Sequence, residues 1–273
     1  MTQSSRPGRF PLGLDQVQPA GRPAPLAAQT VLRPQRPLQD LANDAARGVK
    51  PSGLGLDSQP VRQRMVQRLR ADGINHDTVL SAFASVERHL FVDTALATQA
   101  YEDTSLPIGL EQTISKPSVV ARMLALAFEG EGARARGHLG RVLEIGTGCG
   151  YQTALLSRLS KSVVSIERLK GLYDRARENL VPWRGADIRL VHGDGRLGHA
   201  PWAPFDTIVS AAGGEDVPQL WLDQLAEGGR LIAPAAHALR GGQALCVVDR
   251  SAQGYSRSWL DAVNFVPLKS GRS

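Results

Sequence analysis

Apolar side chains recur at helical spacing in three stretches after residue 58. The first predicted helix covers 61–69 and stops at Asp72-Gly73, the second begins after His76-Asp77, and the third opens near Pro117. Their apolar faces hold Val61, Met65, Val66 and Leu69, then Val79, Leu80, Phe83 and Val86, then Val120, Met123, Leu124 and Leu126. The segment 101–116 contains glycine, proline and many polar residues, so we predict a loop there.

From residue 141 onward, short apolar runs alternate with amphipathic stretches of helical length. Strands are predicted at 141–150 (ending in a glycine turn), 162–167, 188–192, 205–210 and 229–234 and near 244–248 and 259–265, with helices at 151–159, 171–180 and 218–225. Each crossover between parallel strands lays a helix on the sheet. The pattern therefore predicts a doubly wound α/β fold with a mostly parallel seven-stranded sheet and additional N-terminal helices.

Residues 1–58 lack this periodicity and hold eight prolines, six glycines and one aromatic residue, Phe10. We expect a disordered Pro/Gly-rich tail, followed by one domain over 59–273 with a helical and loop part at 59–130 and a sheet part at 131–273. A targeting peptide is the alternative for the tail, although prolines at 7, 11, 19, 23 and 25 would break its amphipathic helix.

The net charge of +6 does not indicate a nucleic-acid-binding protein. The tail carries seven basic and four acidic side chains, which leaves the body at only +3, without a basic stripe. The longest apolar run, Met123 to Phe128, is far shorter than a membrane span. We therefore expect neither a nucleic-acid partner nor a membrane helix.

The cysteines and histidines do not form a metal-binding pattern. Cys149 and Cys246 are far apart in the sequence and form no CxxC, and no two of the six histidines have HxH or HxxxH spacing. We expect no metal site and no disulfide, and the simplest inference is a reducing compartment.

The most informative motif is the glycine-rich turn from Glu144 to Gly150, between a predicted strand and a predicted helix. Ligands bind at this edge of doubly wound sheets, and glycines at 146, 148 and 150 permit a close backbone approach. A tight structural turn is one alternative. A dinucleotide site is another, but its third glycine should fall at position 151, which is Tyr151.

Two further acids follow predicted strands. Glu167 ends the second strand, 21 residues after Gly146, which is the distance at which an acid meets a ribose in nucleotide-binding sheets. A surface glutamate at a strand end is the alternative. His192-Gly-Asp-Gly195 closes the third strand and is weak evidence by itself.

The G-x-G-x-G spacing, with Glu144 two residues before the first glycine, resembles motif I of the S-adenosylmethionine-dependent methyltransferases. With the segment Leu106–Pro117, the HGDG motif and Asn264–Leu268, the chain closely resembles the protein-L-isoaspartate O-methyltransferase family from about residue 61 to 271. The resemblance implies that 59–130 contains the substrate loop and 131–273 the cofactor-binding sheet.

The resemblance also assigns residues to the site. It implies that Ser115 is catalytic and that the cofactor contacts Thr113, Ile114, Ser115, Glu144, Gly146, Thr147, Gly148, Gly150, Glu167, Arg168, Asp194 and Gly195. In the methyltransferase pattern, Asp194 reaches the adenine amino group. The resemblance further implies that the substrate contacts Leu106, Pro107, Ile108, Gly109, Ala211, Val266, Pro267 and Leu268. Ser115 has an alternative interpretation as the N-cap of the helix near Pro117.

The implied reaction transfers a methyl group from S-adenosylmethionine to the α-carboxyl of L-isoaspartyl residues in damaged peptides and proteins, leaving S-adenosylhomocysteine and initiating repair. The acceptor is ionised at pH 7, so no general base is required. We expect a cytoplasmic monomer. A nicotinamide-dependent oxidoreductase, which Tyr151 disfavours, and a non-catalytic methyltransferase-like binding module are the alternatives.

The sequence departs from the family pattern at two places near the substrate side. Relatives commonly have Thr-Ala-Ala-Pro after the fourth strand, where this chain has Ser210-Ala-Ala-Gly-Gly214. The customary Pro-Val-Gly after the fifth strand is Pro234-Ala-Ala236. We expect these changes to alter the peptide groove and to leave the cofactor motifs intact.

Overall fold

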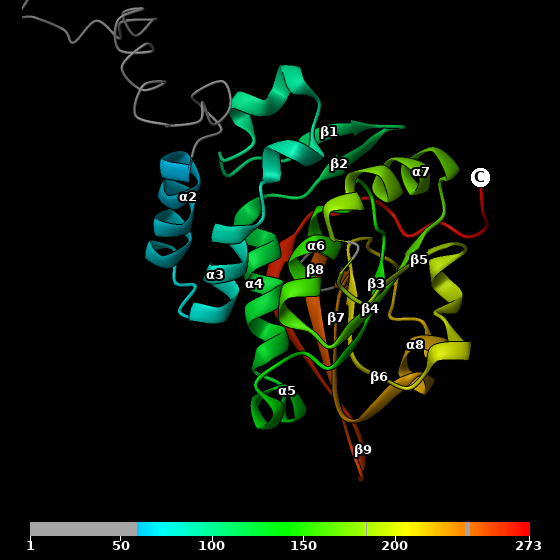
Figure 1. Ribbon diagram of the computed structural model, residues 1–273. Coiled ribbons are helices and arrows are strands. Elements are labelled where there is room, and N and C mark those ends of the chain that lie inside the picture. Colours follow the sequence, from blue (N-terminus) through cyan, green and yellow to red (C-terminus); the bar gives the residue numbers. More distant parts are fainter. Residues whose placement is uncertain (1–58, 184, 238–240) are drawn as a thin grey trace, which may run out of the picture. The chain divides into compact units, whose positions relative to one another are not determined.

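The computed structural model of the protein describes residues 59–183, 185–237 and 241–273 (Figure 1). The predicted tail over 1–58 lies outside the described residues. The described part contains the expected seven-stranded sheet and, in addition, a separate sheet of two short strands.

The large sheet has the order β5-β4-β3-β6-β7-β8-β9. Its strands are β3 (Arg141–Ile145), β4 (Ser162–Glu167), β5 (Ile188–His192), β6 (Phe205–Ser210), β7 (Leu225–His237), β8 (Gly242–Ser251) and β9 (Gly254–Val263). The first five are parallel, whereas β8 and β9 are antiparallel additions. The chain goes from β3 outward to β5 and then returns to the other side of β3. A crevice for ligands is therefore expected between β3 and β6, where the winding reverses.

Helices cover both faces of this sheet. The α-helices are α2 (Gln59–Ala71), α3 (Asp77–Ser85), α4 (Pro117–Phe128), α5 (Glu131–Arg136), α6 (Tyr151–Leu159), α7 (Lys170–Asn179) and α8 (Gln219–Asp223). The 3-10 helices are η2 (Arg88–Phe91), η3 (Thr94–Gln99), η4 (Val181–Trp183), η5 (Gly195–Leu197) and η6 (Ala200–Trp202). Val142 packs with the α2, α3, α4, α6 and α7 side, whereas its neighbour Leu143 packs with Trp221 of α8. This alternation explains why β3 is apolar on both faces.

Several predicted boundaries need correction. Helix α8 covers only Gln219–Asp223, because β7 already begins at Leu225, before the predicted start at 229. Strand β9 was expected near 259–265 but covers Gly254–Val263. It therefore begins five residues earlier and ends two residues earlier than predicted. Helix α5 was not predicted, because only Ala133 of its six residues is buried and no apolar period marks it.

The loop prediction for 101–116 is wrong in its centre. Residues Leu106–Gly109 form β1 and Gln112–Ile114 form β2, which pair as an antiparallel hairpin. The two turn residues are Leu110 and Glu111, with φ of 50° and 58°, where glycine or asparagine is usual. Short strands and an atypical turn hide the hairpin from pattern analysis.

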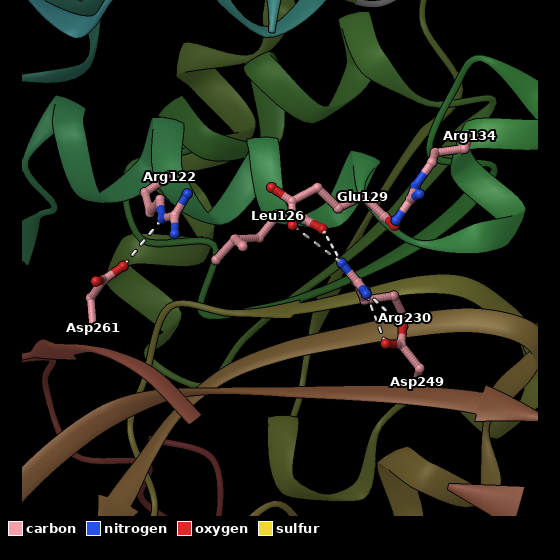
Figure 2. Close-up of polar contacts among 7 residues, drawn as sticks. All are labelled: Arg122, Leu126, Glu129, Arg134, Arg230, Asp249 and Asp261. Carbon is pink, nitrogen blue, oxygen red and sulfur yellow. Dashed lines mark hydrogen bonds and ion pairs between the residues drawn. The ribbon is translucent and has the colours of Figure 1, made fainter. Parts of the chain in front are cut away.

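Arg230 of β7 attaches the C-terminal end of α4 to the antiparallel edge of the sheet (Figure 2). Its guanidinium donates two hydrogen bonds to the Asp249 carboxylate, at 2.6 and 2.7 Å, and a third to the carbonyl of Leu126 at 2.8 Å. The Arg230 side chain is only 14% exposed, which limits solvent screening of these bonds.

Replacing Arg230 with methionine is expected to lower the free energy of unfolding by about 1 to 2 kcal/mol, because charge-assisted bonds are lost while Asp249 stays partly solvated. Arg122→Met is the control, since its ion pair with Asp261 is exposed on both sides and should contribute less than about 0.5 kcal/mol. Urea unfolding of both variants measures the difference. Equal effects would contradict the role given to Arg230.

Candidate active site

A cavity of about 310 Å³ opens at the carboxyl ends of β3 and β4 and extends beneath the β1-β2 hairpin. It brings together predicted residues from the hairpin, from the glycine turn at 144–150, from the HGDG motif at 192–195 and from the C-terminal segment 264–268. Those lining it are Ile108, Thr113, Ile114, Ser115, Gly146, Thr147, Gly148, Glu167, Arg168, Gly195, Ala211, Val266, Pro267 and Leu268. Predicted cofactor and substrate residues therefore share one cavity.

The glycine turn leads from β3 into α6 along the floor of this cavity. Gly146, Gly148 and Gly150 all have positive φ, as the motif predicts. The N–H of Gly146 donates to the carbonyl of Ile166 at 2.9 Å, and the N–H of Gly148 donates to the Glu167 carboxylate at 2.9 Å. The turn is thus fixed to the end of β4.

Glu167 is 5% exposed and lines the cavity. One carboxylate oxygen accepts from Gly148 and the other accepts from the N–H of Leu169 at 2.9 Å. Each oxygen retains a second lone pair for a ligand hydroxyl. The carboxylate both braces the glycine turn and faces the space where a ribose is predicted.

Replacing Glu167 with alanine is expected to weaken cofactor binding by roughly 1 to 3 kcal/mol, because it removes a charged acceptor and the bond to the turn. Titration calorimetry with S-adenosylhomocysteine measures this change. Asp223→Ala, at an exposed position on α8, is the control and should leave the affinity unchanged. If Glu167→Ala folds normally and binds as the wild type does, the ribose assignment is wrong.

Glu144 lies beneath the glycine turn and is not among the residues that line the cavity. It is fully buried, and one of its oxygens accepts from Thr153 Oγ1 at 2.5 Å and from Ser165 Oγ at 2.6 Å. Ser165 Oγ also bonds Thr147 Oγ1 at 2.6 Å, and Thr147 does line the cavity. The structure therefore connects Glu144 to the cavity indirectly, through this chain of hydroxyl groups.

Burial raises the pKa of Glu144 to about 7, against bonds from Ser165 and Thr153 that favour the carboxylate. A raised pKa stabilises the fold below the ordinary value of 4.5, and this stabilisation is lost as the pH rises to about 7. Glu144→Gln does not titrate. Between pH 4.5 and about 7 we expect the free energy of unfolding of the Glu144→Gln variant, relative to that of the wild type, to rise by on the order of 3 kcal/mol. Urea unfolding at several pH values measures this difference. A pH-independent difference would contradict the assignment.

Ser115 follows β2 directly and is half-buried at the cavity wall. Its interpretation as an N-cap is wrong: the N-cap position of α4 is Lys116, which makes no side-chain capping bond. Asp103 caps the helix instead, because its carboxylate accepts from the N–H of Ser118 at 2.8 Å and from the Ser118 hydroxyl at 2.7 Å. The Ser115 hydroxyl is not required for this cap.

The hairpin that carries Thr113 and Ile114 is tied to α7 (Figure 1). Arg175 of α7 donates to the carbonyl of Ile108 at 2.8 Å. Leu110 at the turn lies so close to Gly171 that a Cβ at 171 would be 3.2 Å from Leu110 Cδ1. Because Ile108, Thr113 and Ile114 line the cavity, the hairpin covers it on the side next to α7.

The two departures from the family pattern lie side by side on the substrate side. The N–H of Gly213 donates to the carbonyl of Val266, and the N–H of Leu268 donates back to Gly213, both at 2.8 Å. A proline at 213 has no N–H to donate. Gly214 bonds to Pro234 and Ala236 in the same way. The departures thus secure Val266 and Leu268 at the cavity wall.

The remaining predicted residues lie outside the cavity lining. They are Leu106, Pro107 and Gly109 of β1, Glu144 and Gly150 around the glycine turn, and Asp194. Both oxygens of Asp194 accept backbone N–H groups, from Arg196 at 2.9 Å and from Gly271 at 2.7 Å. Its contact with an adenine stays a prediction.

Sequence analysis missed several residues that line the cavity. They are Glu111, Gln112, Val120, Ile145, Cys149, Tyr151, Gln152, Ile166, Leu169, Leu172, Ala212 and Lys269. Many directly adjoin a motif residue, so extending each motif by one or two positions finds them. The apolar ones, such as Val120 and Leu172, look like ordinary helix core positions in the sequence.

Membrane-spanning helices and metal-binding clusters are both absent from the described ranges. No helix within 59–183, 185–237 and 241–273 combines the length and hydropathy needed to cross a membrane. Within those same ranges, no three acidic, histidine or cysteine side chains are grouped so that they could hold a metal ion.

Comparison with known proteins identifies the family. The family model of protein-L-isoaspartate(D-aspartate) O-methyltransferase matches residues 60–273. Protein-L-isoaspartate O-methyltransferases from Methylibium petroleiphilum and Leptothrix cholodnii are 60% and 56% identical over 275 and 278 residues. The alignments cover 99% and 100% of this chain and 99% and 97% of theirs.

Solved structures agree in fold. One protein-L-isoaspartate O-methyltransferase has a TM-score of 0.67 and 27% identity, covering 77% of this chain and 66% of that chain. A Plasmodium falciparum structure described as a beta-aspartate methyltransferase in complex with S-adenosyl-L-homocysteine has a TM-score of 0.66 and 24% identity, with coverages of 76% and 98%. The match to the family model and the identity to the two curated relatives show that the chain belongs to the protein-L-isoaspartate(D-aspartate) O-methyltransferase family.

Proposed function

We propose that this cavity carries out the family reaction, with Glu167 and the glycine turn holding S-adenosylmethionine and Ser115 orienting the acceptor. The reaction transfers a methyl group to the α-carboxyl of L-isoaspartyl residues in damaged peptides and proteins. The observation that supports the assignment best is that Ser115, Gly148 and Glu167, from three separate segments, line one cavity.

The cavity fits this cofactor. Glu167 offers acceptor sites for ribose hydroxyls. The glycine turn leaves space between itself and the hairpin, since a Cβ at Gly148 would lie 3.3 Å from Ile108 Cδ1. When bound, S-adenosylmethionine supplies an electrophilic methyl group on a sulfonium centre. The methyl acceptor is then expected next to Ser115, between the hairpin and the Val266–Leu268 segment.

The protein's contribution is orientation and exclusion of water. A carboxylic acid is ionised at pH 7, so the nucleophile needs no deprotonation. The Ser115 hydroxyl donates a hydrogen bond that points one carboxylate oxygen at the methyl group. The β1-β2 hairpin covers the site and removes water that would stabilise the anionic nucleophile.

Methoxide leaves an ester carbonyl far more readily than oxide leaves a carboxylate. A backbone amide nitrogen of the peptide attacks the ester carbonyl, loses its proton and expels methanol. The resulting succinimide is hydrolysed in part to normal aspartate, so methylation initiates repair. Because only the local isoaspartyl linkage need enter the cavity, the enzyme acts on many damaged proteins. A net charge of +3 over residues 59–273, without a basic stripe, supports a function without nucleic acid. We further propose that the enzyme acts as a monomer in the cytoplasm.

The proposal is tested by incubating the protein with methyl-labelled S-adenosylmethionine and an isoaspartyl peptide. We expect one methyl group on the peptide by mass spectrometry, followed by release of methanol as the succinimide forms. A parallel titration should show binding of S-adenosylhomocysteine and not of NAD. Cofactor binding without methylation would instead support the binding-module alternative, and NAD binding the oxidoreductase.

A further inference from the structure

Arg88 is a completely buried cation at the base of the hairpin. It is the first residue of η2, has an exposed fraction of 0%, and precedes the buried Phe91 by three residues. The Arg88 guanidinium does not line the cavity.

The guanidinium connects the two ends of the hairpin. Its Nη2 donates to the carbonyl of Ser115 at 2.8 Å and, more weakly, to the carbonyl of Thr104 at 3.4 Å. Thr104 lies two residues before β1 and Ser115 directly follows β2. One nitrogen therefore spans the entry and the exit of the segment that covers the cavity.

Below these carbonyls, the guanidinium lies over the ring of Tyr151, with its central carbon 4.9 Å from the ring centroid. Tyr151 is the first residue of α6, directly after the glycine turn, and it lines the cavity. Arg88 thus fixes the position of Ser115, at the end of the hairpin, relative to the start of α6, the helix that follows the glycine turn.

This arrangement is costly for stability. Arg88 Nε and Nη1 are buried and have no hydrogen-bond partner in the described part of the chain. The carboxylate of Asp103, the acid that attracts the cation, is bonded to Ser118. A buried cation with two unpaired donor groups destabilises a fold, and an apolar side chain of the same size would avoid that loss. Stability therefore does not explain the arginine.

We propose that Arg88 is a positioning residue for methyl transfer: by joining the Thr104 and Ser115 carbonyls above Tyr151, it holds the Ser115 hydroxyl at the reacting carboxylate. This inference rests on the proposed function of Ser115. An arginine suits the role because its planar nitrogens donate in fixed directions, whereas a lysine ammonium rotates freely.

A double-mutant cycle with Ser115 tests the proposal. Arg88→Met is expected to lower kcat/KM for an isoaspartyl peptide at least tenfold per folded molecule, because small misplacements of reacting groups are costly. In a Ser115→Ala background, the same change should cost less than about threefold, because the hydroxyl it positions is absent. Equal losses in both backgrounds would overturn the proposal.

Hydrogen exchange provides a second readout that does not require activity. Arg88→Met should accelerate exchange of the backbone amides in 106–115 and leave those of β3 and β4 at wild-type rates. Arg230→Met is the matched control, since it also removes a buried bond from an arginine to a carbonyl, on the opposite end of α4. Unchanged exchange over 106–115 in Arg88→Met would overturn the proposal.

If the methionine variant does not fold, the Arg88→Lys variant is used for both the kinetic measurement and the hydrogen-exchange measurement. Its single ammonium can keep one of the two carbonyl bonds, so we expect a three- to tenfold loss in kcat/KM and a smaller acceleration of exchange over 106–115. Wild-type values of both would contradict the proposal. If the wild-type protein did not methylate the peptide, the proposed function would fail, whereas the exchange result would still report on the hairpin.

Discussion

Replacing Gly148 with valine is expected to abolish measurable binding of S-adenosylhomocysteine, a loss of more than about 100-fold, and with it methyl transfer. Gly148 has φ of +58°, which a β-branched residue rarely adopts. A Cβ there would lie 3.3 Å from Ile108 Cδ1, and the two valine methyl groups would extend into the cavity between the hairpin and the glycine turn. Backbone strain at position 148 and the volume of the valine side chain in the cavity therefore both oppose binding of S-adenosylhomocysteine.

Gly242→Val is the control for this experiment, because a Cβ at the exposed start of β8 would meet nothing within 4 Å. Titration calorimetry and thermal unfolding are measured on both variants. A Gly148→Val protein that folds and binds S-adenosylhomocysteine with wild-type affinity would show that the cofactor does not lie against this turn.

Replacing Ser115 with alanine is expected to reduce isoaspartyl-peptide methylation by about 100-fold per folded molecule, because the acceptor carboxylate loses its orientation. Cofactor affinity should stay within a few-fold of the wild type. Since Ser115 positions a carboxylate that is already ionised, the alkaline side of the pH profile should keep its shape. A general base would instead add an ascending limb near its own pKa.

Ser118→Ala is the matched control, one turn further along the same segment. Its hydroxyl donates to Asp103 at the start of α4, so loss of this one hydrogen bond should cost about 1 kcal/mol of stability and leave turnover unchanged. Melting temperature and turnover are measured on both variants. Wild-type turnover in folded Ser115→Ala would exclude the role given to this hydroxyl.

The central sheet could be predicted from the sequence because its strands are buried runs between clear breaks. Strands β4, β5 and β6 and helix α6 have the predicted bounds. The β1-β2 hairpin could not be predicted, because its strands have three or four residues and its turn places Leu110 and Glu111 in the left-handed region. Only pairing in the folded chain makes these segments strands.

The site was predictable where function depends on local sequence. The spacing of Gly146, Gly148 and Glu167 identifies the cavity floor because strand ends bring these residues together. The depth of Glu144 below the turn and the place of Arg88 depend on contacts between distant segments. In the sequence, Arg88 resembles any surface arginine, since arginines are rarely buried.

The most direct test of the proposed function compares two peptides that differ only in one linkage, one with L-isoaspartate and one with normal L-aspartate. Methyl transfer from labelled S-adenosylmethionine is measured for both under the same conditions. We expect methylation of the isoaspartyl peptide and none above background for the aspartyl peptide. Equal transfer to both, or transfer to neither by a folded protein that binds S-adenosylhomocysteine, would contradict the proposed function.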